Sequence, residues 1–383
     1  MVDTLQNVGA MHVKSYDTLT AVRWDSILDK NTQQESIQRF PDAQIQQQLT
    51  IGNDTFLNTD KEITIRDPAV STQELVAAAG SFCYLDQLVL DVSACDFDTQ
   101  QLLALRRVYP GEIRCNLELF GFRFDSSVQE LDFSGISMKS TDELEQMLPI
   151  LQKLKKVIMC DCGFSSEEMD ALSHRQPDVQ FVWNVQIGRA VIRTDTKAFI
   201  PWKFGYYPTG GVSPLSDADN RLFDKDCVEL KYCRDMVALD LGHMGLTDFS
   251  FLQYMPNLQY LILADNPATD YSGLQYAKNL VFLEIFMTEF DQAEVLTSLT
   301  NLRDLNLGYS TIKNWEPLTE MTWLERLWIP GAYNLTTKNG HEIKEALPNT
   351  QVIYNGAHST DHNWRGGKYY KQMRDLLGMP HLD

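Results

Sequence analysis

Histidine and aspartate residues occur in two clusters whose spacing could support proton transfer or metal binding. His243 lies near Asp240 and Asp265, and such a group can act as a general acid–base pair. His358 and His362 are four residues apart, the histidine spacing of a helical zinc site. The Ser-Thr-Asp between them does not favour a helix, and no glutamate base follows. We therefore predict no metal site, and a solvated surface position is the simpler interpretation of His243.

Other catalytic motifs are missing from the sequence. It contains no GxSxG, no Walker loop and no GxGxxG after a strand. We predict a protein that is not an enzyme and needs no cofactor. The alternative is an enzyme with a closed site under the loop 201–215, in which His243 and Asp240 would act.

A second group of side chains could bind a partner instead. Aromatic and charged residues recur 22 residues apart in columns that begin at positions 238, 240, 242 and 243. Exposed aromatic residues and arginine contribute disproportionately to interfaces. The predicted binding residues from these columns are Asp240, Tyr260, Phe282, Glu284, Phe286, Asp304, Tyr309, Arg326 and Trp328.

These columns lie between apolar positions that repeat with the same period. One apolar column consists of Met236, Leu258, Leu280, Leu302 and Leu324, and further leucine or isoleucine residues follow three and five positions after each. A short strand with its return segment cannot bury an apolar face alone, whereas stacked copies form a continuous core. The period therefore predicts a repeat array in which the columns between the leucines face outward from one side of a sheet.

The pattern resembles the leucine-rich repeat, in the 22-residue form of bacterial internalin-like proteins. Its leucines match LxxLxLxxNxL well, but only Asn266 fills the asparagine position, which elsewhere holds Met244, Thr288, Ser310 and Ala332. Water or other side chains must then satisfy the backbone of the turn. The resemblance implies an α/β fold, a right-handed solenoid (horseshoe) with a parallel sheet on its concave side and helices or irregular segments on its convex side.

The N-terminal half repeats with a longer unit of about 68 residues, because Pro41, Pro110 and Pro177 close three similar segments. Each proline follows a helical pattern, and Asp98 and Ser165 are predicted N-caps of the last two helices. An alternating segment then predicts an inserted β-hairpin, with Gly52, Gly121 or Gly188 near its turn.

Four parts are predicted along the chain. Residues 1–200 form the irregular repeats with hairpins, 201–235 a loop and a linking helix over Asp217–Leu230, 236–355 the regular repeats, and 356–383 a tail. A closing strand is expected within 347–354, and a helix near Tyr369–Leu377 is expected to cap the array. The loop candidates for binding are Trp202, Phe204, Tyr206 and Tyr207.

Charge and composition restrict the partner. The formal net charge of −19 disfavours nucleic acid, and no apolar run is long enough to insert into a membrane. The N-terminus lacks a secretory signal pattern, which leaves a cytoplasmic protein or a trimmed exported one. The long hairpin units and the STxxxWR tail also resemble leucine-rich-repeat proteins of gut Firmicutes, which are mostly exported. That resemblance implies an extracellular or cell-surface location.

The predicted function is recognition of a protein through the concave face of the C-terminal repeats. A carbohydrate is the nearest alternative ligand, because Tyr260, Phe282 and Trp328 could stack on sugar rings. Two structural alternatives remain. The aromatic residues could stiffen the sheet by cross-strand stacking, or the 201–215 loop or the tail could fold over them.

Overall fold

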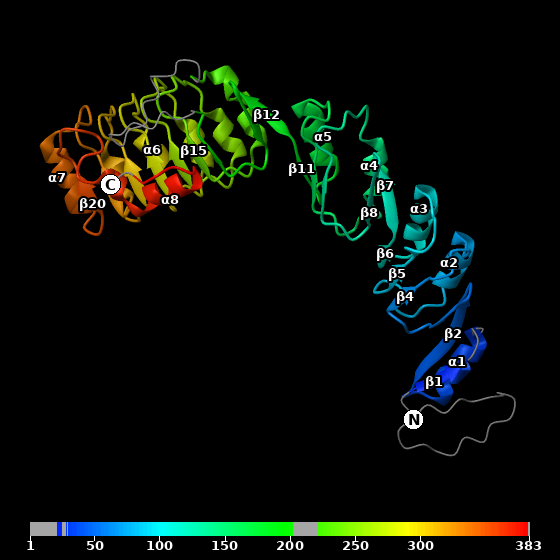
Figure 1. Cartoon of the computed structure of the whole chain (residues 1–383). Helices are drawn as coiled ribbons and strands as arrows, with labels where there is room; N and C mark the ends of the chain where they lie inside the picture. The colour runs from blue at the N-terminus through cyan, green and yellow to red at the C-terminus, as the bar shows by residue number, and fades with distance from the viewer. Residues whose placement is uncertain (1–20, 25–27, 29, 202–220, 382–383) are drawn as a thin grey trace. The chain divides into compact units, whose positions relative to one another are not determined.

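The computed structural model describes residues 21–24, 28, 30–201 and 221–381, which form two compact units (Figure 1). The first unit contains the described residues up to Ile158 together with 178–180, and the second contains the remainder. The aromatic loop residues Trp202, Phe204, Tyr206 and Tyr207 lie outside the described residues. Among the helices that are described, none is long and apolar enough to cross a membrane.

The first unit alternates short strands with helices, and its core consists of the apolar residues that those strands and helices bury. Parallel pairs join β1 to β2, β4 to β5, β5 to β6, and β9 to β10. The elements are β1 (Ala21–Trp24), α1 (Lys30–Arg39), β2 (Gln44–Ile51), β3 (Asp54–Leu57), β4 (Glu62–Thr64), α2 (Thr72–Ala79), β5 (Val89–Asp91), α3 (Thr99–Val108), β6 (Glu112–Arg114), β7 (Asn116–Leu119), β8 (Phe122–Asp125), β9 (Glu130–Asp132), α4 (Asp142–Met147) and β10 (Lys156–Ile158).

Three antiparallel hairpins interrupt this alternation where the sequence predicts them. They are β2–β3, β7–β8 and, in the second unit, β12 (Asn184–Ile187) with β13 (Ala190–Arg193). Gly52, Gly121 and Gly188 occupy the turns with φ of 55°, 83° and 59°. A left-handed backbone at these positions explains the glycines, because a Cβ atom is disfavoured there.

Local capping signals correctly predict the starts of two helices. Asp98 and Ser165 each accept a hydrogen bond from the third residue of their helix, α3 and α5 (Ser166–Arg175), and form a capping box. The linking helix predicted over Asp217–Leu230 is wrong for its described part. That part consists of two 3₁₀ segments, η3 (Asp224–Asp226) and η4 (Val228–Tyr232).

The second unit is built on a seven-stranded parallel sheet that runs in chain order, and we call it the ladder. Tyr260 pairs with Phe282 and Phe282 with Asp304, so neighbouring strands align residues 22 positions apart. The strands are β14 (Ala198–Phe199), β15 (Ala238–Asp240), β16 (Tyr260–Ile262), β17 (Phe282–Glu284), β18 (Asp304–Asn306), β19 (Arg326–Trp328) and β20 (Gln351–Ile353). Strand β20 confirms the closing strand predicted within 347–354.

Each of the strands β15 to β19 is followed by a return segment, and the leucine columns between strand and return are buried. The return segments are η5 (Ser250–Tyr254), η6 (Ser272–Tyr276), α6 (Ala293–Leu296), η7 (Glu316–Glu320) and α7 (Thr337–Ala346). Strand β11 (Gln180–Val182) lies at the division between the units. The third hairpin, which follows β11, belongs to the second unit. Next to it, the ring of Trp183 packs 5.7 Å from that of Tyr232. The division at residue 200 that the sequence suggests stays a prediction.

Side chains form hydrogen bonds with the backbone groups in the turns of the ladder, including repeats that lack the asparagine of the pattern. Asn266 donates to the carbonyls of Leu241 and Leu263 at 2.9 Å and accepts from the amides of Gly245 and Leu246. The next two repeats hold Thr288 and Ser310 at this position, and both hydroxyls donate to the Ile285 carbonyl. Hydroxyl side chains thus take the place of asparagine in two of the four repeats that depart from the pattern.

The C-terminal end folds differently from the prediction. Helix α8 (Lys368–Leu376) lies close to the predicted helix, but it does not cap the end of the array. Its residues Tyr370 and Met373 belong to one buried cluster with Tyr260 and Phe282 of β16 and β17, in the middle of the ladder. The short segment η8 (Trp364–Gly366) precedes it. We call residues 355–381 the C-terminal segment (red in Figure 1).

Candidate functional site

Eight of the nine predicted binding residues lie together on one side of the ladder, which we call the ladder face, and Tyr309 follows it at the sixth position of its repeat. The face consists of the side chains at the first, third and fifth positions counted from the start of β15 to β19, that is, the columns that begin at Ala238, Asp240 and Gly242. The strand register aligns Tyr260, Phe282 and Asp304, and likewise Glu284, Asn306 and Trp328, as the 22-residue spacing predicts.

Their predicted exposure is wrong for the six that are buried, whereas Asp240, Tyr309 and Arg326 are half-buried. Phe282 and Trp328 are 0% exposed, Tyr260 is 7% exposed, and Glu284, Phe286 and Asp304 are also buried. Side chains of the C-terminal segment cover them, which is one of the two structural alternatives left open by the sequence.

Trp364 is the centre of this cover. Its ring stacks on Phe282 at 5.5 Å between centroids, with planes 27° apart, and lies 5.1 Å from the ring of Trp328. Tyr370 of α8 lies 5.9 Å from Phe282, and the Tyr260 hydroxyl donates to Gln372 at 3.1 Å. Aromatic pairs at such distances contribute beyond the area that they bury.

The ladder face also holds the backbone of the C-terminal segment. Asn306 Nδ2 donates to the Ser359 carbonyl at 3.0 Å, Trp328 Nε1 to that of Asp361 at 2.8 Å, and Arg326 to that of Trp364 at 3.1 Å. The Tyr309 hydroxyl donates to the carbonyl of Ala357. Four ladder side chains therefore bind main-chain carbonyls, groups that any extended peptide offers.

Glycines allow the closest approach on both sides. A Cβ atom built on Gly308 of the ladder would lie 3.0 Å from the Ser359 Cα atom. One built on Gly367 would lie 1.8 Å from a guanidinium nitrogen of Arg326, far inside van der Waals contact. The two surfaces thus fit each other only because these positions lack side chains.

Buried charges lie beneath the cover. The Trp364 indole donates to the Glu284 carboxylate, and Arg326 forms an ion pair with Asp304. The Arg326 guanidinium also lies over the rings of Trp364 and Trp328, at 4.4 and 5.2 Å from their centroids. Arg326 therefore joins the ladder face to the cover through charge, aromatic and hydrogen-bond contacts.

Burial changes the acidity of these groups. It raises the pKa of Glu284 to about 7, although the hydrogen bond from Trp364 and the nearby Arg365 oppose the shift. Burial likewise raises the pKa of Asp240 to about 6, against the amide of Gly242 and His243. The pKa of Asp304 is raised by burial and held back by Arg326.

The acid–base cluster at the edge of the face is assembled in part. His243 Nδ1 lies 2.8 Å from the Asp265 carboxylate, and its ring lies 6.3 Å from that of Phe286. Asp240 instead accepts from the amide of Gly242 at 3.1 Å. Within the described ranges, no group of three histidine, cysteine or acidic residues could hold a metal ion.

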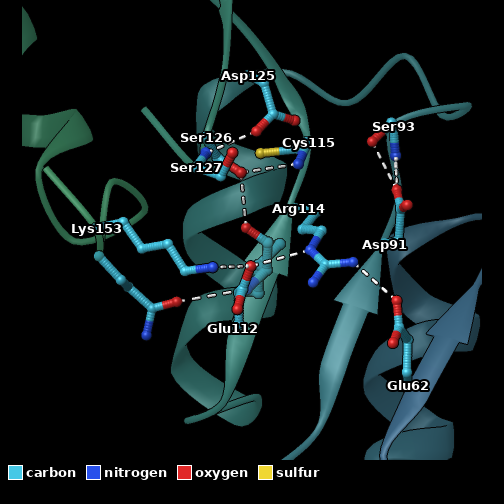
Figure 2. A network of polar contacts seen from close by, with 12 residues as sticks. Glu62, Asp91, Ser93, Glu112, Arg114, Cys115, Asp125, Ser126, Ser127 and Lys153 are labelled. Atoms are coloured by element: carbon cyan, nitrogen blue, oxygen red, sulfur yellow. Dashed lines mark hydrogen bonds and ion pairs between the residues drawn. The ribbon is translucent and has the colours of Figure 1, made fainter. Parts of the chain in front are cut away.

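The first unit presents a different, polar surface (Figure 2). Glu112 accepts from Lys153 at 2.7 Å and from Arg114 at 3.0 Å, and Arg114 also pairs with Glu62 at 2.8 Å. Ser126 donates to the Ile113 carbonyl and accepts from the amide of Cys115, which ties the second hairpin to β6. One of these ion pairs joins β6 to β4 across β5, and no aromatic residue takes part in them, so the ladder face is the stronger candidate.

Sequence analysis missed the residues that complete the site, chiefly Ser359, Trp364, Tyr370 and Met373. A signal for them was present. Tyr370, Met373 and Leu377 follow a helical spacing, and the C-terminal segment has four Lys/Arg against two Asp in a chain with a net charge of −19.

The comparisons with known proteins find matches among solved structures alone. No protein-family model and no curated protein matches the sequence. Among solved structures, internalin C2 of Listeria monocytogenes is 17% identical, with a TM-score of 0.27, over 40% of this chain and 81% of the other. A second internalin of Listeria monocytogenes is 14% identical, with a TM-score of 0.30, over 86% of this chain and 89% of the other. A leucine-rich-repeat protein of Leptospira interrogans is 16% identical, with a TM-score of 0.33, over 84% of this chain and 74% of the other. Similarity this distant says nothing about a partner or an activity.

Proposed function

We propose that this chain is a non-catalytic recognition module that binds a protein partner through the ladder face. The observation that carries the proposal is the set of donors from Asn306, Arg326 and Trp328 to main-chain carbonyls of the C-terminal segment. Side chains that bind peptide carbonyls around a central aromatic anchor form the chemistry of a peptide-binding groove. The partner would take the place of the C-terminal segment.

The form of the apolar surface favours a protein over a sugar. Tyr260, Ile262, Phe282, Phe286 and Trp328 form one continuous buried cluster with the cover. A carbohydrate site would instead have separate aromatic platforms along a solvent-lined trough. The enzyme alternative depends on the 201–215 loop, most of which lies outside the described residues, so it stays a hypothesis.

A variant with an open face tests the proposal. In Gly367→Val, the added side chain collides with Arg326, whose guanidinium is held by Asp304 and two indole rings. The variant should release the C-terminal segment without changing the ladder face. We call Gly367→Val the opened variant.

The measurement is capture of proteins from lysate and from extracellular extract, with the opened variant as bait and the same chain carrying Phe282→Ala and Trp328→Ala as control. We expect a protein that the opened variant retains at least tenfold better than the control. Both baits must first show the same cooperative melting. Equal capture by the two would contradict a role for the ladder face.

A further inference from the structure

The C-terminal segment has the composition of a ligand for the surface that it covers. It carries four Lys/Arg and two Asp, whereas the ladder face carries Asp240, Glu284 and Asp304 against Arg326. Arg365 and Arg374 lower the pKa of Asp240, and Arg365 lowers that of Glu284, so these cations lie close to the carboxylates. An acidic face and a basic segment are electrostatically complementary.

The anchors of the segment have a defined order. Trp364 inserts between the rings of Phe282 and Trp328, the glycine three residues later passes Arg326, and Tyr370 and Met373 follow on one side of a helix. Apolar anchors three residues apart on a helix are typical of a helix bound in a groove. The stretch before Trp364 is a turn, in which His362 and Asn363 have left-handed backbones, and it is held through the carbonyls of Ser359 and Asp361.

One short, exposed stretch of backbone connects the segment to the last ladder strand. It leaves β20 through Asn355, Gly356 and Ala357, which are exposed, and Gly356 has a φ of 147°. Ladder side chains contact the side chains and main-chain carbonyls of the segment. No described strand of the ladder forms a β-pairing with the segment. Such a segment can leave without breaking the sheet.

We propose that the ladder face selects a basic protein segment built like residues 358–377, and that the chain's own C-terminal segment occupies the site in its place. The ligand class is a peptide with a tryptophan, a basic residue directly after it, a glycine at the third position, and a helix with aromatic or methionine anchors six and nine positions on. This proposal rests on the proposed function and names its partner class.

Competition from the attached segment follows from its tethering. A short linker gives a tethered ligand an effective concentration in the millimolar range. A free peptide must displace the attached segment. The apparent affinity of the peptide for the native chain therefore equals its intrinsic affinity multiplied by the fraction of chains that are open. Affinity should therefore rise when the attached segment is released and the face stays intact.

The test uses a fluorescent synthetic peptide of residues 355–381 and three forms of the full-length chain: wild type, the opened variant and Trp364→Ala. We expect both variants to bind the peptide at least tenfold more tightly than wild type by fluorescence anisotropy. A peptide with Trp364→Ala should bind about 30-fold or more weakly, and one with Arg365→Glu at least threefold more weakly. Two opening variants keep the test valid if one of them fails to fold.

A matched pair of tyrosines supplies the control on the receptor. Tyr260→Phe in the opened variant removes the hydroxyl that donates to Gln372, and should weaken peptide binding by roughly three- to tenfold. Tyr276→Phe changes a tyrosine that is 52% exposed on η6, and should leave binding unchanged.

Two results would overturn the proposal: equal binding of the peptides with and without tryptophan, or equal affinity of the wild-type and opened chains. If the opened variant captures a protein through Phe282 and Trp328 but ignores the peptide, the named partner class is wrong while the proposed function stands. If it captures neither, both fail.

Discussion

Glu284 shows at the scale of a single residue how the cover depends on its surroundings. Its carboxyl group faces Trp364, Arg365, Arg326, Asp240 and Tyr370, and burial outweighs the two arginines. The pKa of this group is therefore about 7 when covered, compared with an ordinary value of 4.5. Between pH 4.5 and about 7, Glu284 therefore keeps its proton in the covered state and has lost it in the open state.

The sign of the pH dependence follows. Covering by the C-terminal segment is most favourable below about pH 4.5 and weakens as the pH rises to about 7, by up to about 3 kcal/mol. We expect the indole N–H resonance of Trp364, assigned by its loss in Trp364→Phe, to move toward a solvent-exposed position between pH 5.5 and 8. Glu284→Gln keeps an acceptor and should abolish most of this change. A resonance that is constant with pH, or the same titration in the glutamine variant, would contradict the role given to Glu284.

Met287 illustrates a strain that repeats along the ladder. His243, Asp265, Met287 and Tyr309 occupy the same repeat position, and all have a φ between 52° and 61°. Since Met287 is 48% exposed, Met287→Gly should relieve this strain at little loss of packing. Relief of the left-handed backbone, worth about 1–2 kcal/mol, should exceed the entropy cost of glycine, which is about 0.5–1 kcal/mol. We therefore expect the free energy of unfolding to rise by about 0.5–1 kcal/mol in a chemical denaturation experiment. Met287→Ala keeps the Cβ atom and should show no gain, so an equal gain in both variants would refute the explanation.

At the scale of elements, Asn266 determines how one turn meets the next strand. It is buried and bonds four backbone groups of two neighbouring repeats, at Leu241, Leu263, Gly245 and Leu246. Asn266→Ala leaves these groups without a partner and should destabilise the chain by about 2–4 kcal/mol, measured by thermal and chemical unfolding.

Asn279 is the matched control, because it is exposed and donates only to the Pro256 carbonyl at 2.7 Å. Asn279→Ala should cost less than about 1 kcal/mol. Equal losses in the two alanine variants would show that the turn does not depend on Asn266.

Elements that depend on local sequence were predictable, and the cover was not. The period of 22 residues predicts where each ladder strand lies and aligns Phe282 with its neighbours. Glycines such as Gly188 identify the hairpin turns. Both signals are readable because each lies within one repeat. The contact between Trp364 and Glu284 joins residues 80 positions apart, and no periodic pattern relates them. The helix α8 was therefore predictable, whereas its place on the ladder was open among several alternatives.

At the scale of the whole molecule, the chain carries both the proposed recognition face and a segment that covers it. Two features distinguish this arrangement from an ordinary core. The buried face contains Glu284 and Asp304, charged residues that an obligatory core disfavours, and the segment approaches through glycines rather than through strand pairing. The cover is therefore expected to open as a unit, independently of the ladder.

Hydrogen exchange of the wild-type chain and of Gly367→Val tests this separability most directly. We predict that the backbone amides of α8 exchange at least tenfold faster in the variant, while those of β15 to β19 keep their wild-type protection. Added peptide of residues 355–381 should leave the strands protected and slow exchange around Trp328 and Asn306. If α8 and the ladder strands lose protection together, the C-terminal segment is part of the core, and the account of a covered recognition face is contradicted.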